Sequence, residues 1–257
     1  MIGSIGYIKS EIPRAAGNHF LAVNVSLKVA SFLEVDIKGQ NLKVVFVLER
    51  TWYDSRLRLI HLKKNPSLNV LWEKTYEKLW YPSLRFENVD FSKEHSFRHL
   101  TYTIYRDLKI EPKLLNPGTE NVANLFKGSD HKLVRRQEYN FFWKCVYILK
   151  WFPFDQQTCQ MKMALPEHYT DFVKLRAEMV EYKGDKDELT EYSIEKILFC
   201  SQANGTRLVF EVTLGRPLIG SILTIFIPTL LLLVIRFNPY LSDVDVWYIT
   251  MLILSSA

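Results

Sequence analysis

Cysteine is scarce in this chain, and no catalytic or nucleotide-binding signature occurs along it. Only three cysteines are present among 257 residues: Cys145, Cys159 and Cys200. Three are too few for a disulfide-rich scaffold, and no C-x-x-C spacing indicates zinc. The G-x-S-x-G, H-E-x-x-H, P-loop and dinucleotide fingerprints are also missing, so we expect neither an enzyme nor a cofactor.

Blocks of like charge are missing as well. The formal net charge of +5 at pH 7 comes from single Lys and Arg residues scattered among the acidic ones. A nucleic-acid-binding surface needs basic residues gathered in a run or on one face, so we expect no nucleic-acid partner. His95 and His99 are four residues apart, but their segment is strand-like or loop-like and lacks a third ligand. We therefore predict no metal site.

A secretory leader is not evident at the start of the chain. The first twenty residues lack the sustained apolar core of a signal peptide, so residues 1–20 are predicted to be unstructured or a truncated N-terminus. Two sequons, at Asn24 and Asn204, nevertheless fit a secreted protein and predict glycosylation at both positions.

Strands are the clearest feature that is present. From Val23 to Ile37 the odd positions are mostly apolar and the even positions mostly polar, which predicts a strand with one buried face. A turn at 38–41 and renewed strand character over Leu42–Leu59 make a long hairpin. Further strands are predicted at Arg98–Arg106, Val134–Lys150, Thr158–Leu165, Phe172–Tyr182, Tyr192–Leu198 and Thr206–Leu214.

Many strands without helical periods between them indicate a mainly β, immunoglobulin-like sandwich over residues 21–216. A short helix is expected around Ser67–Leu79. Nineteen uncharged residues, Pro217–Ile235, then lie between two arginines. Their length matches the apolar thickness of a bilayer, which predicts a transmembrane helix over 217–235 and leaves a buried core helix as the alternative. The tail, 236–257, contains only a short apolar stretch.

The sharpest local signal is the segment between Cys145 and Cys159. Thirteen residues separate these cysteines and include Phe152-Pro153-Phe154-Asp155. If the two are paired, they close a hairpin-sized loop whose aromatic tip is exposed, and such exposed apolar groups usually mark a partner surface. The alternative is a hairpin crosslinked for stability alone, worth about 3 kcal/mol for a loop of this size.

This segment resembles the namesake loop of the Cys-loop receptors, the pentameric neurotransmitter-gated ion channels, in which thirteen residues with an F-P-x-D core lie inside a disulfide. The segment 52–57 is similar to the family's W-x-D-x-R-L, and 79–82 with Asn88 to its L-W-x-P-D…N, with Ser83 in place of the aspartate. Arg216-Pro217 resembles the junction with the first membrane helix. The resemblance implies a Cys145–Cys159 disulfide and scaffold roles for Trp52, Asp54, Arg56, Trp80, Pro82 and Asn88.

The resemblance further implies a ten-stranded extracellular domain that forms a pentamer with homologous subunits at the plasma membrane. In such an assembly a small ligand binds between neighbours, and loops near the lipid bilayer pass the signal to the pore. The coupling elements are then the turn Asp36–Asn41 and the residues Phe152, Pro153, Phe154, Asp155 and Arg216. The chain itself is expected to cross the membrane once.

The ligand pocket departs from the family pattern. Val47 and Glu49 occupy positions where the family has an aromatic residue and, in amino-acid-gated members, an arginine, and the adjacent Arg50 should point to the other face of the sheet. The segment around Cys200 has one cysteine instead of the vicinal pair of acetylcholine-binding subunits. Ligand-binding candidates are Phe86, Tyr169, Phe199, Val47 and Glu49, and we expect a ligand other than acetylcholine or glycine.

The segment Val89–Val134 is longer than the family core needs and is expected to carry a surface insertion. Together with Phe86 and the leucine-rich stretch after Arg216, it resembles orphan members of the anion-channel branch. No pore-lining second helix follows residue 235, so we expect a truncated subunit. The alternatives are a non-conducting decoy that assembles with full-length partners and a secreted ligand-binding protein of the same fold.

Overall fold

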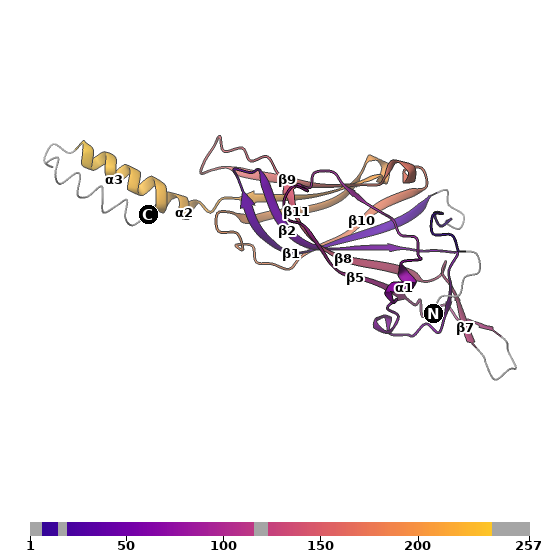
Figure 1. Cartoon of the computed structure of the whole chain (residues 1–257). Coiled ribbons are helices and arrows are strands. Elements are labelled where there is room, and N and C mark those ends of the chain that lie inside the picture. Colours follow the sequence, from indigo (N-terminus) through magenta and orange to yellow (C-terminus); the bar gives the residue numbers. More distant parts are fainter. Residues whose placement is uncertain (1–6, 15–19, 116–122, 238–257) are drawn as a thin grey trace.

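A computed structural model of the chain describes residues 7–14, 20–115 and 123–237. Its strands form an elongated sandwich, and a helical segment leaves one end of that sandwich (Figure 1). The short helix α1, Glu73–Tyr76, and the strand β7, Ala123–Lys127, lie at the opposite end. The molecule therefore has two distinct poles, called here the N-terminal end and the helix end.

The larger sheet has five strands in the order β10-β1-β2-β8-β5. Their bounds are β1 Leu21–Asp36, β2 Asn41–Trp52, β5 Ser96–Tyr105, β8 Lys132–Lys144 and β10 Val173–Tyr182. The predicted period of two is confirmed in β1, where Val23, Val25, Leu27 and Val29 are fully buried. Strand β1 runs antiparallel to β2 and parallel to β10.

The second sheet has four strands in the order β11-β12-β9-β4. Their bounds are β4 Arg85–Phe86, β9 Gln156–Ala164, β11 Ser193–Gln202 and β12 Arg207–Gly215. The apolar faces of the two sheets meet in one continuous core. The predicted sandwich is thereby confirmed, and the strand predicted to reach Lys150 ends at Lys144, where the chain turns into the loop between the two cysteines.

A third, small sheet makes the strand count higher than predicted. It has the order β3-β7-β6, with β3 Arg58–Ile60, β6 Lys113–Leu115 and β7 Ala123–Lys127. The described residues thus form twelve strands instead of ten. The strand predicted over 42–59 is split after Trp52 because a turn closes there, with Leu57 N–H donating to the Asp54 carbonyl over 3.1 Å.

The helix predicted at 67–79 is divided into two short pieces. A 3₁₀ turn covers Pro66–Leu68 and α1 covers Glu73–Tyr76. Between them Val70 forms an isolated β-bridge with Thr103. The buried Asn69 side chain also bonds the carbonyls of Lys63 and Ile104, over 2.9 Å and 3.1 Å. These tertiary bonds hold the backbone out of a continuous helix.

The single helix predicted over 217–235 is also interrupted, which corrects that prediction. Helix α2 covers Leu218–Ser221, a π-helical segment covers Ile222–Phe226, and α3 covers Ile227–Arg236. Pro228 has no N–H to donate to the carbonyl four residues earlier, so the turn before it widens. Of the helices that the structure describes, none has both the length and the apolar character required to cross a membrane. Residues 238–257 lie outside the described residues.

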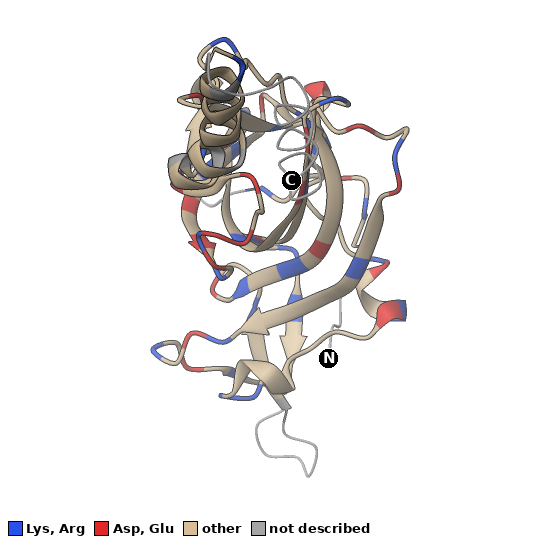
Figure 2. Cartoon of the chain, turned by 90° about the vertical axis from the view of Figure 1, so that its left-hand side faces the viewer, with Lys and Arg blue, Asp and Glu red and all other residues tan. Residues whose placement is uncertain are grey.

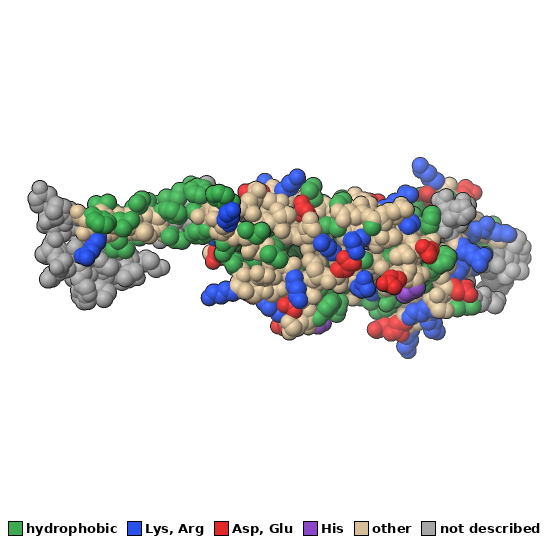
Figure 3. All heavy atoms as spheres, turned by 90° about the horizontal axis from the view of Figure 1, so that it is seen from above, with side chains coloured by type: hydrophobic (Ala, Val, Ile, Leu, Met, Phe, Trp, Pro, Cys, Tyr) green, Lys and Arg blue, Asp and Glu red, His purple; other side chains and the backbone are tan. Residues whose placement is uncertain are grey.

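Side chains along this helical segment are mainly hydrophobic, whereas the face of the sandwich in Figure 3 mixes both signs of charge. Figure 2, which looks along the molecule from the helix end, likewise shows acidic and basic residues interspersed on the strands. The start of the chain, predicted as unstructured or truncated, is different within residues 7–14. There Tyr7 and Ile12 pack against the core, and residues 1–6 and 15–19 lie outside the described residues.

Candidate functional site

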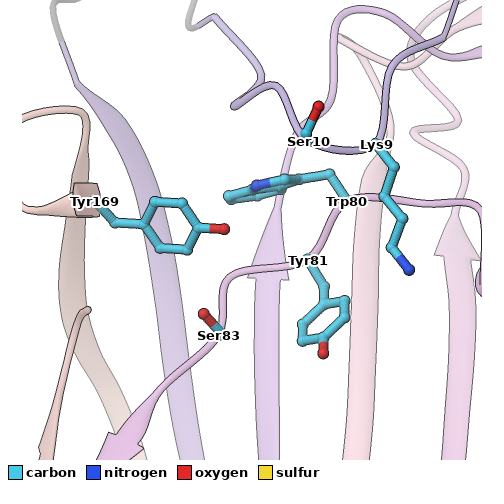
Figure 4. A pocket seen from close by; sticks show the side chains of 6 residues that line it. All are labelled: Lys9, Ser10, Trp80, Tyr81, Ser83 and Tyr169. Atoms are coloured by element: carbon cyan, nitrogen blue, oxygen red, sulfur yellow. The ribbon is translucent and has the colours of Figure 1, made fainter. Parts of the chain in front are cut away.

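A cavity of about 540 Å³ opens near the N-terminal end of the sandwich (Figure 4). Three segments that are distant in sequence form its walls: the start of the chain, the connection from α1 to β4, and the 3₁₀ turn Glu167–Tyr169 after β9. The lining residues are Lys9, Ser10, Trp80, Tyr81, Ser83 and Tyr169. Of the predicted ligand-binding residues, the cavity includes Tyr169 alone.

Aromatic rings form much of the cavity wall. The Trp80 and Tyr169 rings point toward one another (Figure 4) in an edge-on arrangement with centroids 6.0 Å apart. Behind them Trp80 meets the fully buried Trp52 edge-on at 6.1 Å. The π faces of Trp and Tyr attract cationic groups. Lys9 contributes a positive charge to the same lining, so the cavity offers sites for both an ammonium group and an anionic group.

A hydrogen-bonded network supports this cavity from within the sandwich. Asp54 is buried, and Arg56 donates to both of its carboxylate oxygens, from Nε over 2.9 Å and from Nη2 over 2.8 Å. The Tyr7 hydroxyl donates to Asp54 Oδ2 over 2.8 Å and accepts from the Trp80 backbone N–H over 2.9 Å. Arg56 Nη1 also donates to the carbonyls of Ile8 and Glu11. The network therefore fixes both the start of the chain and the Trp80 wall.

Two other predicted ligand-binding residues face the core instead of the cavity. Phe86 packs edge-on against Tyr139 and Phe141, with centroids 5.2 Å and 5.1 Å away. Phe199 lies directly opposite Phe210, which is buried between the sheets. The structure therefore does not bring Phe86 and Phe199 together with Tyr169 around the cavity.

Val47 and Glu49 lie on the outward face of the larger sheet, away from the cavity. Glu49 forms an ion pair with Arg136 Nε at 2.5 Å, and Arg136 Nη2 donates to the Tyr105 hydroxyl over 2.8 Å. The Glu49 hydrogen bond raises the pKa of Arg136. Arg136 is therefore already matched by an acidic side chain and is not available to a ligand carboxylate.

At the helix end, Cys145 and Cys159 form a disulfide with a Cα–Cα distance of 5.3 Å. The loop that they close, called here the disulfide loop, covers residues 145–159 and exposes large apolar side chains. Trp151 and Phe154 are about 70% exposed, at 70% and 68%, while Phe152 is half-buried at 40%. The loop tip is therefore a contiguous apolar surface at the end from which the helical segment leaves.

The root of this loop is joined to the start of the helical segment by a buried ion pair. Arg216 Nε lies 3.0 Å from Asp155 Oδ1, and its Nη2 donates to the Tyr192 hydroxyl over 2.5 Å. The guanidinium also stacks on the Tyr192 and Phe152 rings, 4.4 Å and 4.9 Å from their centroids. Arg216 thus contacts both the disulfide loop and Tyr192, the residue directly before β11.

Burial raises the pKa of the Asp155 carboxyl, but the hydrogen bonds from Arg216 and Gln157 outweigh it and hold the pKa below its ordinary value. Gln157 donates to Asp155 Oδ2 over 2.6 Å and also bonds both backbone groups of Ile148 across the loop. Asp155 is therefore ionised at neutral pH and holds the loop closed through two partners.

The β1–β2 turn lies beside the disulfide loop. Cys145 N–H donates to the Gln40 carbonyl over 2.9 Å, and the Tyr147 hydroxyl donates to the Asn41 carbonyl over 3.1 Å. Within the turn, Gly39 N–H donates to Asp36 Oδ1 over 2.7 Å, and a Cβ at residue 39 would lie 2.2 Å from Asp36 Oδ2. All three predicted coupling elements are therefore in one place.

The remaining predicted residues occupy strands and their connections. Asn88 bonds the Gln160 carbonyl over 2.6 Å and the Lys162 N–H over 2.9 Å, and the Pro82 carbonyl accepts from Arg50. Asn24 is half-buried within β1. Asn204 is exposed at the β11–β12 hairpin tip, with a left-handed φ of 54°.

His95 and His99 are both exposed, and His95 contacts the rings of Phe91 and Phe97. Within the described ranges, three or more His, Cys, Asp or Glu side chains nowhere gather in a metal-binding group.

Sequence reasoning missed Tyr7, Gln157 and Tyr192. Each of them hydrogen-bonds a residue of a recognised motif but is not itself one of the residues that define that motif. Tyr7 is 47 positions from its partner Asp54, and Tyr192 is 24 from Arg216. No local pattern signals such pairings, because they arise only when the strands meet.

A disulfide-closed apolar loop at one end of a two-sheet sandwich, with an aromatic cavity near the other, defines a ligand-binding domain of receptor type. The chain belongs to the neurotransmitter-gated ion-channel ligand binding domain family, whose model matches residues 3–211. That family comprises the extracellular parts of membrane receptors and is not a family of enzymes. No curated protein matches the chain.

Proposed function

We propose that this chain is a receptor subunit that binds a small extracellular ligand and passes the binding signal to a membrane pore. The observation that carries the proposal is the buried Arg216–Asp155 pair. Arg216 precedes the helical segment by one proline, and Asp155 lies in the disulfide loop. A movement of the loop therefore acts directly on the helix start through a 3.0 Å ion pair.

The cavity at Trp80 and Tyr169 is the proposed ligand site. Its aromatic walls suit an ammonium group and Lys9 suits an anionic group. The volume of about 540 Å³ is in the range of pockets that hold drug-sized ligands, and glycine is far smaller. Acetylcholine has no anionic group to use Lys9. The ligand class is therefore a zwitterion larger than glycine, consistent with a ligand other than acetylcholine or glycine.

The proposed assembly is a pentamer of homologous subunits at the plasma membrane, with the sandwich outside the cell. Support comes from the family match and from the exposed tip of the disulfide loop, where Trp151 and Phe154 leave a large apolar area uncovered. In this arrangement the tip faces the membrane part of the receptor. Asn204, at an exposed hairpin tip, is the better placed of the two proposed glycosylation sites.

Ligand binding tests the proposal directly. Purified full-length chain is screened by thermal unfolding against a panel of biogenic amines and amino acids that includes acetylcholine and glycine. We expect at least one zwitterion larger than glycine to raise the unfolding temperature. Tyr169→Ala and Lys9→Ala should abolish that shift, whereas Tyr53→Ala, which removes an exposed tyrosine outside the cavity, should preserve it. Micromolar binding of acetylcholine or glycine would refute the ligand class.

Coupling is tested separately by electrophysiology in cells that express this chain with a full-length subunit of the family. A coupled receptor subunit gives ligand-dependent current that Arg216→Ala abolishes without changing ligand affinity. A reduction of the partner's current by this chain, unaffected by Arg216→Ala, would instead identify a decoy. Recovery of the chain from the medium without detergent would identify a secreted binding protein.

A further inference from the structure

Two arginines lie side by side in the interior of the sandwich. Arg50 on β2 and Arg135 on β8 are direct cross-strand partners, and both side chains are buried, with residue exposures of 2% and 7%. As the alternation along β2 predicts, Arg50 points to the face opposite that of Glu49. Paired like charges inside a core are unusual, because each needs a counter-charge to offset its desolvation.

Hydrogen bonds to neutral acceptors satisfy only some of the N–H donors of these two arginines. Arg50 donates to the Pro82 carbonyl over 2.9 Å and to the Tyr139 hydroxyl over 3.2 Å. Arg135 donates from Nη2 to Gln137 Oε1 over 2.9 Å. The Nε–H groups of both arginines are buried and have no acceptor within the described part of the chain. A guanidinium has five donors, so each arginine retains capacity for another acceptor.

No carboxylate offsets the two charges among residues 7–14, 20–115 and 123–237. Arg56, Arg136 and Arg216 each lie within ion-pair distance of an acidic side chain, but neither Arg50 nor Arg135 does. Their neighbours are instead tyrosines: the Arg135 guanidinium lies 4.1 Å from the Tyr81 ring centroid and 5.6 Å from that of Tyr102.

Arg50 stays charged at neutral pH. Burial, together with the nearby charge of Arg135, lowers the pKa of Arg50 to about 10, which is still well above 7. Glu73 and Glu77 act electrostatically on Tyr76, whose ring stacks on that of Tyr102, and both carboxylates are exposed to solvent. A buried water would accept from the free Nε–H groups but would leave two positive charges without a counter-charge.

We propose that Arg50 and Arg135 bind a small monovalent anion, a halide or a compact carboxylate, inside the sandwich of a single subunit. The anion accepts hydrogen bonds from the two free Nε–H groups and offsets the paired charges. This site is separate from the ligand cavity but adjoins its wall, because Tyr81 lines the cavity while its ring covers Arg135, and the Pro82 carbonyl bonds Arg50. Anion occupancy therefore stabilises the connection 80–83.

Anion titration of the purified full-length chain tests this proposal. Thermal unfolding is followed in sodium chloride and in sodium acetate, each compared with sodium gluconate at the same ionic strength, because gluconate is too bulky for a buried site. Line broadening of ³⁵Cl in NMR spectra reports halide binding independently, and displacement by acetate distinguishes the carboxylate from the halide. The variants are Arg135→Gln and Arg135→Lys.

Arg136→Gln is the matched control, since Arg136 is the next residue along β8 but faces outward and pairs with Glu49. We expect chloride or acetate to raise the unfolding temperature of the native chain above its value in gluconate. Arg135→Gln should weaken apparent anion affinity by about 10-fold or more, whereas the control should retain it. Arg135→Lys should keep partial affinity, because lysine preserves the positive charge but lacks the planar set of N–H donors of a guanidinium.

Three results would overturn the proposal. The first is equal stability of the native chain in all three salts with no chloride broadening. The second is an unchanged anion response in Arg135→Gln. The third combines two observations. A Glu73→Gln/Glu77→Gln double variant loses as much stability as Arg135→Gln does, and the native chain shows no response to the anions. That result would identify the carboxylates of α1 as the counter-charge.

Discussion

The two ends of the sandwich use the same three side-chain types in different ways. At the N-terminal end Asp54, Arg56 and Tyr7 form a network, and at the helix end Asp155, Arg216 and Tyr192 form another. Each arginine bonds both oxygens of its aspartate and stacks 4.4 Å from the centroid of its tyrosine ring. What differs is how far apart in the chain the partners lie.

Asp54 and Arg56 are two residues apart, whereas Asp155 and Arg216 are separated by 61. The first pair shapes a local turn and captures the start of the chain. The second pair joins two elements that no local bond connects, the disulfide loop and the helix start. The same ion pair is therefore a local brace in one place and a link between segments distant in the chain in the other.

The largest expected effect comes from removing each arginine in turn. Arg216→Ala leaves Asp155 buried without its partner and should lower the free energy of unfolding by about 3–5 kcal/mol. Arg56→Ala should cost about 2 kcal/mol, because its side chain is 20% exposed and water replaces part of the pair. Urea unfolding measures both, and an equal or larger loss in Arg56→Ala would contradict the comparison.

Hydrogen exchange shows where each loss acts. Arg56→Ala should increase exchange in residues 7–14 and leave the disulfide loop protected, whereas Arg216→Ala should do the reverse. Arg58→Ala, which removes a nearby arginine with bonds only to adjacent carbonyls, serves as the control.

A covalent crosslink is present at the helix end, and its removal is the next largest effect. A Cys145→Ser/Cys159→Ser double variant should lose about 3 kcal/mol of unfolding free energy, because the loop between these cysteines, which are 14 positions apart, becomes free in the unfolded chain. Cys200→Ser is the control, since Cys200 is exposed and does not form a disulfide. Reducing agent should lower the unfolding temperature of the native chain and of the control alike, but not of the double variant.

The two tyrosine hydroxyls should differ by a smaller amount. The Tyr7 hydroxyl takes part in three hydrogen bonds, to Asp54, Arg56 and the Trp80 N–H. The Tyr192 hydroxyl accepts one from Arg216 and also interacts with Asp155. Tyr7→Phe should therefore cost about 2 kcal/mol and Tyr192→Phe about 1 kcal/mol. Chemical denaturation provides both values, and the reverse order would show that the N-terminal network is the weaker one.

The smallest effect at neutral pH concerns proton binding. Because the pKa of Asp155 is lower in the folded chain than in the unfolded chain, its pair contributes fully above the unfolded-state pKa of about 3.9. That contribution is lost as the pH falls through the lower, folded-state pKa. Asp155→Asn should therefore flatten the acid side of the stability profile, measured by urea unfolding at successive pH values. The exposed Asp187→Asn should leave that profile unchanged.

The sequence predicted the sandwich because alternation in β1 and β12 is a local property of the chain. It also predicted the disulfide loop and its position beside the β1–β2 turn, through motifs whose spacing is specific. It predicted the lining of the cavity at Trp80 and Tyr169 less well. Phe86 and Phe199 have the right residue type, but strand register turns both toward the core, where Tyr139 and Phe210 cover them.

The interrupted C-terminal helix and the third sheet were missed for related reasons. The uncharged run after Arg216 fits one continuous helix by composition, and Pro228 changes the hydrogen bonding of only one turn within it. The β3, β6 and β7 strands are short, at three to five residues. Segments of that length carry too little periodicity to distinguish a strand from a loop.

The sequence by itself determined the alternation of buried and exposed residues along β1 and β12, which cysteines can close a loop and which charges exist. Only the tertiary structure decided which charges meet. It brought Tyr7 to Asp54 and Arg216 to Asp155, and it left Arg50 and Arg135 side by side without a carboxylate. The physical reason is that ion pairing depends on distances of a few ångströms between segments far apart in the chain, and these distances are set by strand register and sheet packing.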